Sequence, residues 1–144
     1  MNQEDQHPFT WNFYLNATLF GLVAIMGIIV MAGWTLEQRE LLSVLPGLAP
    51  MQFNNAICFV LLGLGGLAHL LSKRWLLRVV SVSGLLLSDL TLAEYVTGSN
   101  FGIDLMFINT DAIIPTAHPG RMAPNSALSH VMSFLSLLLL TGRR

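Results

Sequence analysis

The chain has 144 residues, of which 53% are hydrophobic and only 10% are charged, and its mean hydropathy is +0.63. A soluble domain carries about 25% charged residues, so this composition excludes an ordinary water-soluble protein. The formal net charge of −1, with Lys and Arg dispersed along the chain, gives no sign of a nucleic-acid surface. The single cysteine, Cys58, excludes an internal disulfide and a cysteine-rich metal site.

Four apolar stretches predict an integral membrane protein of the all-α class. They cover residues 11–34, 51–71, 75–96 and 122–140, and each is near the roughly 20 residues that cross a hydrocarbon core. What remains is too short for a soluble catalytic domain of the usual ~100 residues, so we expect no enzyme activity from this chain. The first stretch follows an acidic start and lacks a clear cleavage site, which indicates a retained span rather than a signal peptide.

The basic residues predict how the spans are oriented. Two of them, Arg39 and Arg121, fall on one side of the membrane, and five fall on the other: Lys73, Arg74, Arg78, Arg143 and Arg144. The positive-inside rule then places both termini in the cytoplasm and the long Pro- and Gly-rich connections outside. Spans joined by such links should form an antiparallel bundle. Small residues offer faces for close packing within the chain or with other membrane subunits: Gly21, Ala24, Gly27, Gly63, Gly65 and Gly66.

The second and fourth spans begin alike, which predicts an internal repeat. Segments 50–58 and 121–129 share Met, Asn and Ala at one offset of 71 residues: Met51/Met122, Asn54/Asn125 and Ala56/Ala127. An Asn at a helix start can accept hydrogen bonds from backbone N–H groups that lack an intrahelical partner. Capping alone explains the Asn but not the matched Met and Ala. We therefore predict two pseudo-repeated helical hairpins.

Residues 120–128 read Gly-Arg-Met-Ala-Pro-Asn-Ser-Ala-Leu, and this stretch resembles the recurrent opening of a membrane helix in the N-terminal multi-span region of bacterial sensor histidine kinases and diguanylate cyclases. Segments 92–98 and 101–104 resemble the same region in the same order, and the likeness covers roughly 34–140. It implies a sensory input module in a bacterial inner membrane. Members of that family usually continue into further spans, a third repeat copy and cytoplasmic signalling domains, none of which these 144 residues contain. We therefore expect a piece of a longer sensor, a natural stand-alone relative, or a protein recruited to another task. His130 departs from the family by replacing an apolar or aromatic residue.

Ionisable side chains within the spans are candidates for function, because each costs about 2.5–3.5 kcal/mol to insert. One interpretation is an outward polar pocket, roofed by the long connection, in which carboxylates bind a cation or an amine. The alternative is an ion pair between Glu94 and Arg121 that fastens the connection to the bundle. Asp89 lies about 140° around the helix from Glu94, and a Ser or Thr hydroxyl is its alternative partner. The candidate ligand-binding residues are Asp89, Glu94, Tyr95, Asp104, His118, Arg121, Asn54 and Asn125.

Two histidines within the spans, His69 and His130, are minor candidates for binding a cofactor. Counted from the outer ends they differ in depth by roughly 15 Å, so they cannot be the two axial ligands of one haem. Cys58 and His69 share a face but lie three turns apart, which excludes a shared metal. We predict no cofactor and no metal; a tetrapyrrole on a single histidine is the minor alternative.

Two functional hypotheses follow. In the first, the bundle is a sensory input module that binds a small membrane-soluble or outer-face ligand and passes a helix shift to a cytoplasmic output domain. In the second, the chain is a small accessory subunit of a larger membrane complex of respiratory or photosynthetic type. A sensor needs a kinase or cyclase output domain, whereas a subunit needs stoichiometric membrane partners.

Overall fold

The computed structural model describes residues 7–43, 49–107 and 120–142, and these form helices joined by loops and turns without a β-strand. The long helices are α1 (His7–Thr35), α2 (Phe53–Leu70), α3 (Arg74–Thr97) and α4 (Pro124–Leu140), and a short 3₁₀ helix, η2 (Arg39–Leu42), follows α1. The all-α prediction is confirmed for the described residues. Each long helix begins and ends within four residues of a predicted span.

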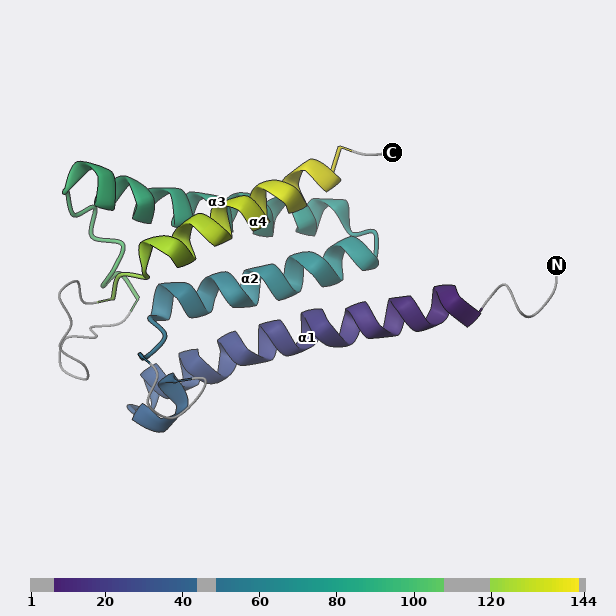
Figure 1. Ribbon diagram of the computed structural model, residues 1–144, viewed down its shortest axis with the longest axis horizontal. Coiled ribbons are helices and arrows are strands. Elements are labelled where there is room, and N and C mark those ends of the chain that lie inside the picture. Colours follow the sequence, from purple (N-terminus) through teal and green to yellow (C-terminus); the bar gives the residue numbers. More distant parts are fainter. Residues whose placement is uncertain (1–6, 44–48, 108–119, 143–144) are drawn as a thin grey trace.

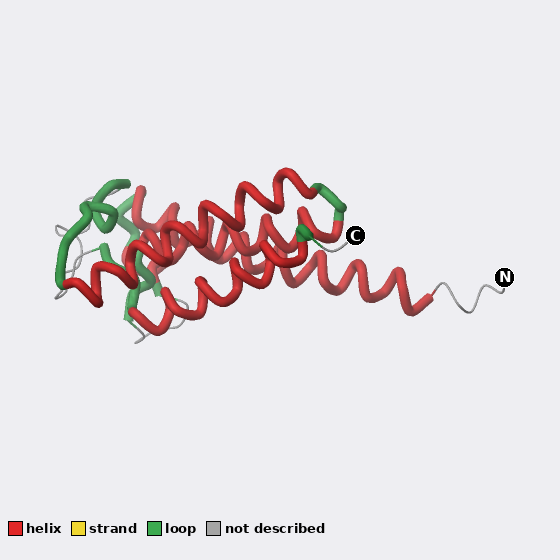
Figure 2. The backbone as a smooth tube through the Cα atoms, turned by 90° about the horizontal axis from the view of Figure 1, so that it is seen from above, coloured by secondary structure: helices red, strands yellow, loops and turns green. Residues whose placement is uncertain are grey.

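The four long helices run antiparallel in chain order, with α2 at the centre of the arrangement (Figure 1). Helix α1 packs on α2 and η2, whereas α2, α3 and α4 all contact one another. The residues between α2 and α3 form a tight turn at one end of the bundle, which we call the turn end (Figure 2). The described parts of the other two connections, residues 36–43 and 49–52 and residues 98–107 and 120–123, lie at the opposite end, which we call the loop end.

Within the described residues, three helices are long and apolar enough to cross a membrane: Thr10–Thr35, Phe53–Leu70 and Arg74–Thr97. This indicates a membrane protein. Helix α4 is apolar but has only 17 residues, or about 25 Å of helix against a hydrocarbon core of about 30 Å. Many large apolar side chains point outward. In α1, only 17% of the most apolar 18-residue segment is buried inside the protein.

Helices α1 and α2 approach closely because small residues lie between them. A methyl group added at Gly27 would come within 2.6 Å of the Ala56 carbonyl oxygen and 2.9 Å of the Val60 nitrogen. One added at Gly63 would come within 2.6 Å of the Ala24 Cβ. Gly21, in contrast, has open space around it. These small-residue faces, except at Gly21, therefore serve contacts inside the chain.

The starts of α2 and α4 correspond at the repeat offset, but the predicted asparagine caps are only partly formed. Both helices begin one residue before the Asn, after Gln52 and Ala123, which make no side-chain capping bond. Asn125 Oδ1 accepts a hydrogen bond from the Ser126 backbone N–H at 3.0 Å. For Asn54 the capping prediction is wrong, because its buried Oδ1 accepts no hydrogen bond from the described residues, while its Nδ2 donates to Ile103 O at 3.1 Å.

Candidate functional site

Three ionic side chains meet at the loop end and form what we call the ionic cluster: Glu94, Asp104 and Arg121. Glu94 lies in the last turn of α3, Asp104 in the following connection, and Arg121 three residues before α4. Arg121 Nε donates to Asp104 Oδ2 at 2.7 Å and lies 3.2 Å from Glu94 Oε2. The side chains are 7% exposed for Arg121, 4% for Asp104 and 0% for Glu94. The ion pair of Glu94 with Arg121, one of the two alternatives from the sequence, is therefore present.

Neighbouring groups hold the ionic cluster in place. Glu94 Oε1 accepts a hydrogen bond from the Phe101 backbone N–H at 2.7 Å. The Tyr95 hydroxyl donates to Met122 O at 3.1 Å, and its ring lies 5.3 Å from the Arg121 guanidinium carbon. The amide of Asn54 holds the residue before Asp104 through its bond to Ile103 O. The cluster thus fastens the connection to the loop ends of α2, α3 and α4.

The ionic cluster carries two carboxylates against one guanidinium. The single Nε–H of Arg121 is directed at Asp104, so Glu94 Oε2 makes an ion pair without a hydrogen bond. Asp104 Oδ1 and Asn54 Oδ1 are also buried without a hydrogen-bond partner in the described part of the chain. Because an ion pair deprived of water is costly to break, this geometry favours a structural latch at the loop end.

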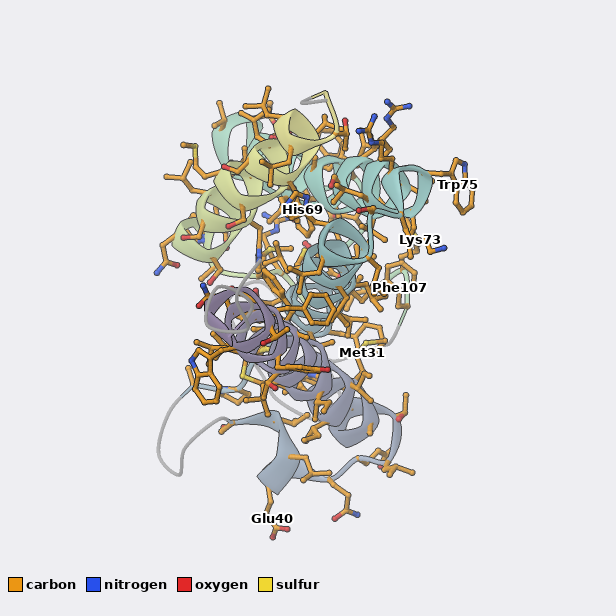
Figure 3. The ribbon with its side chains drawn as sticks, turned by 90° about the vertical axis from the view of Figure 1, so that its right-hand side faces the viewer. Met31, Glu40, His69, Lys73, Trp75 and Phe107 are labelled. Atoms are coloured by element: carbon orange, nitrogen blue, oxygen red, sulfur yellow. The ribbon has the colours of Figure 1, made fainter. Side chains whose placement is uncertain are left out.

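The other candidate residues lie outside this cluster. Asp89 is exposed on α3, and no described residue supplies the Ser or Thr hydroxyl that the sequence offered as its partner. Asn125 is exposed at the start of α4. His118 lies outside the described residues. His69 is exposed near the turn end (Figure 3).

A second polar site lies between α2 and α4, near the loop end. It is an open groove of about 270 Å³, and we call it the α2/α4 groove; its lining residues are Met51, Asn55, Phe59, Asn125, Ser126, Ser129 and His130. Its volume is close to the lower limit of small-molecule sites, about 300 Å³. Most of its lining residues are polar, and Met51 and Phe59 supply the apolar part of the wall.

The polar centre of the α2/α4 groove is a pair formed by Asn55 of α2 and His130 of α4. Nε2 of His130 lies 2.7 Å from Asn55 Oδ1. The imidazole packs edge-on against the Phe59 ring at 5.3 Å and lies 6.1 Å from the Phe134 ring. The residue is 4% exposed. The pair therefore joins two helices at a point where a bound molecule would touch both.

Sequence reasoning placed His130 and Asn125 among the candidates but missed Asn55 and Phe59. A signal for them exists in the sequence. Met51, Asn55 and Phe59 recur every four residues and so share one face of α2, and the offset of 71 aligns Asn55 with Ser126 and Phe59 with His130. No group of three or more metal-binding side chains occurs among the described residues.

No protein-family model, curated protein or solved structure matches this chain.

Proposed function

We propose that this chain is the membrane-embedded sensory input module of a bacterial signal-transduction protein, and that the α2/α4 groove receives the signal. The observation that carries the proposal is the Asn55–His130 pair, a polar contact between two helices that lines an open groove together with the apolar side chains of Met51 and Phe59 and with further polar residues of α4. A ligand that fits is a small amphipathic molecule with one hydrogen-bonding group, dissolved in the membrane or arriving from the outer face. The resemblance of residues 120–128 to bacterial sensor regions supports the same function.

The proposed response is a shift of α4 against α2. A molecule that bonds to His130 in place of Asn55 would remove the direct link between the two helices while filling the groove. Differential binding of this kind shifts a helix-packing equilibrium, and small helix shifts are a common way to transmit a signal. Helix α4 leads from the groove to the turn end, where an attached kinase or cyclase output domain would receive the movement.

The topology that fits this function has four spans, with the turn end in the cytoplasm of a bacterial inner membrane. Five basic residues belong to that side and two to the other, as the positive-inside rule requires. Helix α4 would cross despite its length, since a short span is accommodated by local thinning of the bilayer. The ionic cluster would then lie at the outer surface and keep the long connection over the helix ends.

An accessory subunit of a larger membrane complex of respiratory or photosynthetic type is the second candidate, and one observation favours it. Asp89 is exposed on α3 without a described partner, which suits a helix that meets another polypeptide.

One measurement separates the two candidates. The protein is purified from its native membrane in mild detergent, and every polypeptide that stays with it is identified by mass. A species much larger than 15.8 kDa that carries kinase or cyclase peptides supports the sensor. A 15.8 kDa species in fixed ratio with respiratory or photosynthetic subunits contradicts it and establishes the accessory subunit.

A further inference from the structure

One face of α3 combines exposed apolar side chains with a carboxylate. Trp75, Val82, Leu86 and Val96 are 76%, 43%, 58% and 86% exposed, and Asp89 is exposed among them. The helical period of 3.6 residues places these five positions on one side. We call this side the α3 outer face. The opposite side is buried against α2 and α4, and Figure 3 shows Trp75 pointing away from the bundle.

Asp89 lies within the apolar part of the membrane if α3 spans it. It is eight residues before Thr97 and fifteen after Arg74, which places it about 12 Å from one helix end and about 22 Å from the other. A side chain with a single methylene reaches neither surface. The nearest basic residue of its own helix, Arg78, is eleven residues away, or about 16 Å. No group of α3 therefore neutralises this carboxylate, and lipid supplies no hydrogen-bond donor.

We propose that the α3 outer face docks a transmembrane helix of another polypeptide, and that this helix carries a Lys or Arg at the depth of Asp89. Charged groups inside membranes pair with one another because the hydrocarbon cannot solvate them. The apolar residues on either side of Asp89 supply the packing surface along the full length of α3. The partner is therefore an apolar helix with one basic side chain near its middle.

A second copy of this chain does not provide that cation. Copies inserted in the same membrane share one orientation, so equal residues lie at equal depth. The basic residues of this sequence all fall near the helix ends or in the connections: Arg39, Lys73, Arg74, Arg78, Arg121, Arg143 and Arg144. Two copies that met at this face would bring Asp89 against Asp89. The charge thus selects a different polypeptide.

The test uses a synthetic probe helix. The full chain, labelled with a donor dye at Ser99→Cys, is reconstituted in phosphatidylcholine vesicles; the native Cys58 is buried and stays unlabelled. The probe is a symmetric Leu/Ala peptide of about 20 residues with one central Lys and an acceptor dye. The middle of α3 is about 5 Å from Asp89 along the axis, and the flexible Lys side chain spans this offset whichever way the peptide inserts. A matched peptide has Leu in place of Lys.

We expect energy transfer to report binding of the Lys peptide about fivefold to thirtyfold tighter than binding of the Leu peptide, the range of one polar contact between membrane helices. Asp89→Leu should abolish this preference, and Asp89→Lys should transfer it to a peptide with a central Asp. Glu40→Leu, which removes an exposed carboxylate far from α3, should keep it. Circular dichroism checks that each variant retains its helices.

Three results would overturn the proposal. The two peptides bind equally well to the unaltered chain, or the preference for Lys survives in Asp89→Leu. The third is Asp89-dependent energy transfer between donor-labelled and acceptor-labelled copies of this chain without any peptide, which would assign the face to a second copy.

Discussion

Arg121 carries the only positive charge of the ionic cluster, so its removal should be severe. Arg121→Gln leaves the buried carboxylates of Glu94 and Asp104 without a counter-charge. Breaking a buried pair from one side costs about 3–5 kcal/mol, and we expect a loss of this size in the free energy of unfolding. Denaturant titration in detergent micelles measures it. Arg39→Gln, at an exposed position, is the matched control and should change the free energy of unfolding little. Equal stabilities of the two variants would show that the ionic cluster does not stabilise the fold.

The Asn55–His130 contact should appear as a coupling between two substitutions. Asn55→Leu removes the partner that lies 2.7 Å from His130 Nε2. His130→Phe removes the same contact from the side of the Asn55 amide. Each single change should cost about 1–3 kcal/mol of stability. The double variant replaces both groups by apolar ones and should lose less than the sum of the single losses. Unfolding free energies of all four proteins give the coupling, and strictly additive losses would mean that the two side chains do not interact.

At the residue scale, the sequence was sufficient to anticipate a contact between two charged residues at the same end of their spans. It was not sufficient for a contact that depends on how two helices are rotated relative to each other. Glu94 and Arg121 have opposite charges and both fall at span ends on the same side of the bundle, so their meeting could be anticipated. Asn55 and His130 are 75 residues apart, and their contact requires the rotation of α2 relative to α4. Asp89 shows the same limit, since its depth follows from the sequence but the direction in which it points does not.

Helices α1 and α2 offer a matched pair of glycine substitutions. At Gly27 an added methyl group would meet backbone atoms of α2 at 2.6–2.9 Å, and backbone cannot move aside as a flexible side chain can. Gly27→Ala should therefore separate the helices and cost about 1–3 kcal/mol. At Gly21 nothing lies within 4 Å, and Ala is favoured over Gly inside a helix by roughly 0.5–1 kcal/mol. Gly21→Ala should thus stabilise slightly.

Thermal unfolding of both variants in the same detergent tests this pair. A lower midpoint for Gly27→Ala and an equal or higher one for Gly21→Ala is the expected result. If both shift downward together, the loss belongs to α1 itself and not to its contact with α2.

At the element scale, apolar length was sufficient to predict the helices, because about 20 apolar residues leave few other structures in a bilayer. The helix starts were harder. The motif led us to place Asn54 at a cap, whereas α2 begins one residue earlier, at Phe53. Hydrogen-bonding capacity alone does not say whether an Asn bonds to its own helix or to a distant carbonyl such as that of Ile103. That choice depends on where the connection after α3 folds.

Across the whole molecule, the two predicted hairpins are used differently. Among the described helices, α4 contacts both α2 and α3, whereas α1 packs on α2 and η2 alone. The sequence repeat predicted similar helix starts, and these occur at matching positions, Phe53 and Pro124. It carried no information about the packing of α1, because the repeated motif lies outside that helix. The duplication itself stays a prediction.

The orientation of the whole bundle is open to a direct test with single cysteines. In the proposed topology, Ser99 of the loop end faces outward, and Ser72 of the turn end and Gly142 after α4 face the cytoplasm; all three are exposed. A membrane-impermeant maleimide should therefore label Ser99→Cys in intact cells, and Ser72→Cys and Gly142→Cys only after the cells are broken. The native Cys58 is buried and provides an unlabelled background.

The Gly142→Cys variant decides whether α4 crosses the membrane. This helix has 17 residues and is the shortest of the four long helices, so its crossing most needs the test. Labelling of this position in intact cells, with Ser72→Cys still protected, would leave α4 on the outer side and reduce the protein to three spans. The chain end beyond α4 could then not reach a cytoplasmic output domain, and the sensory proposal would fail. If both positions are protected, α4 crosses the membrane, and a shift of this helix at the α2/α4 groove can be transmitted to the cytoplasm.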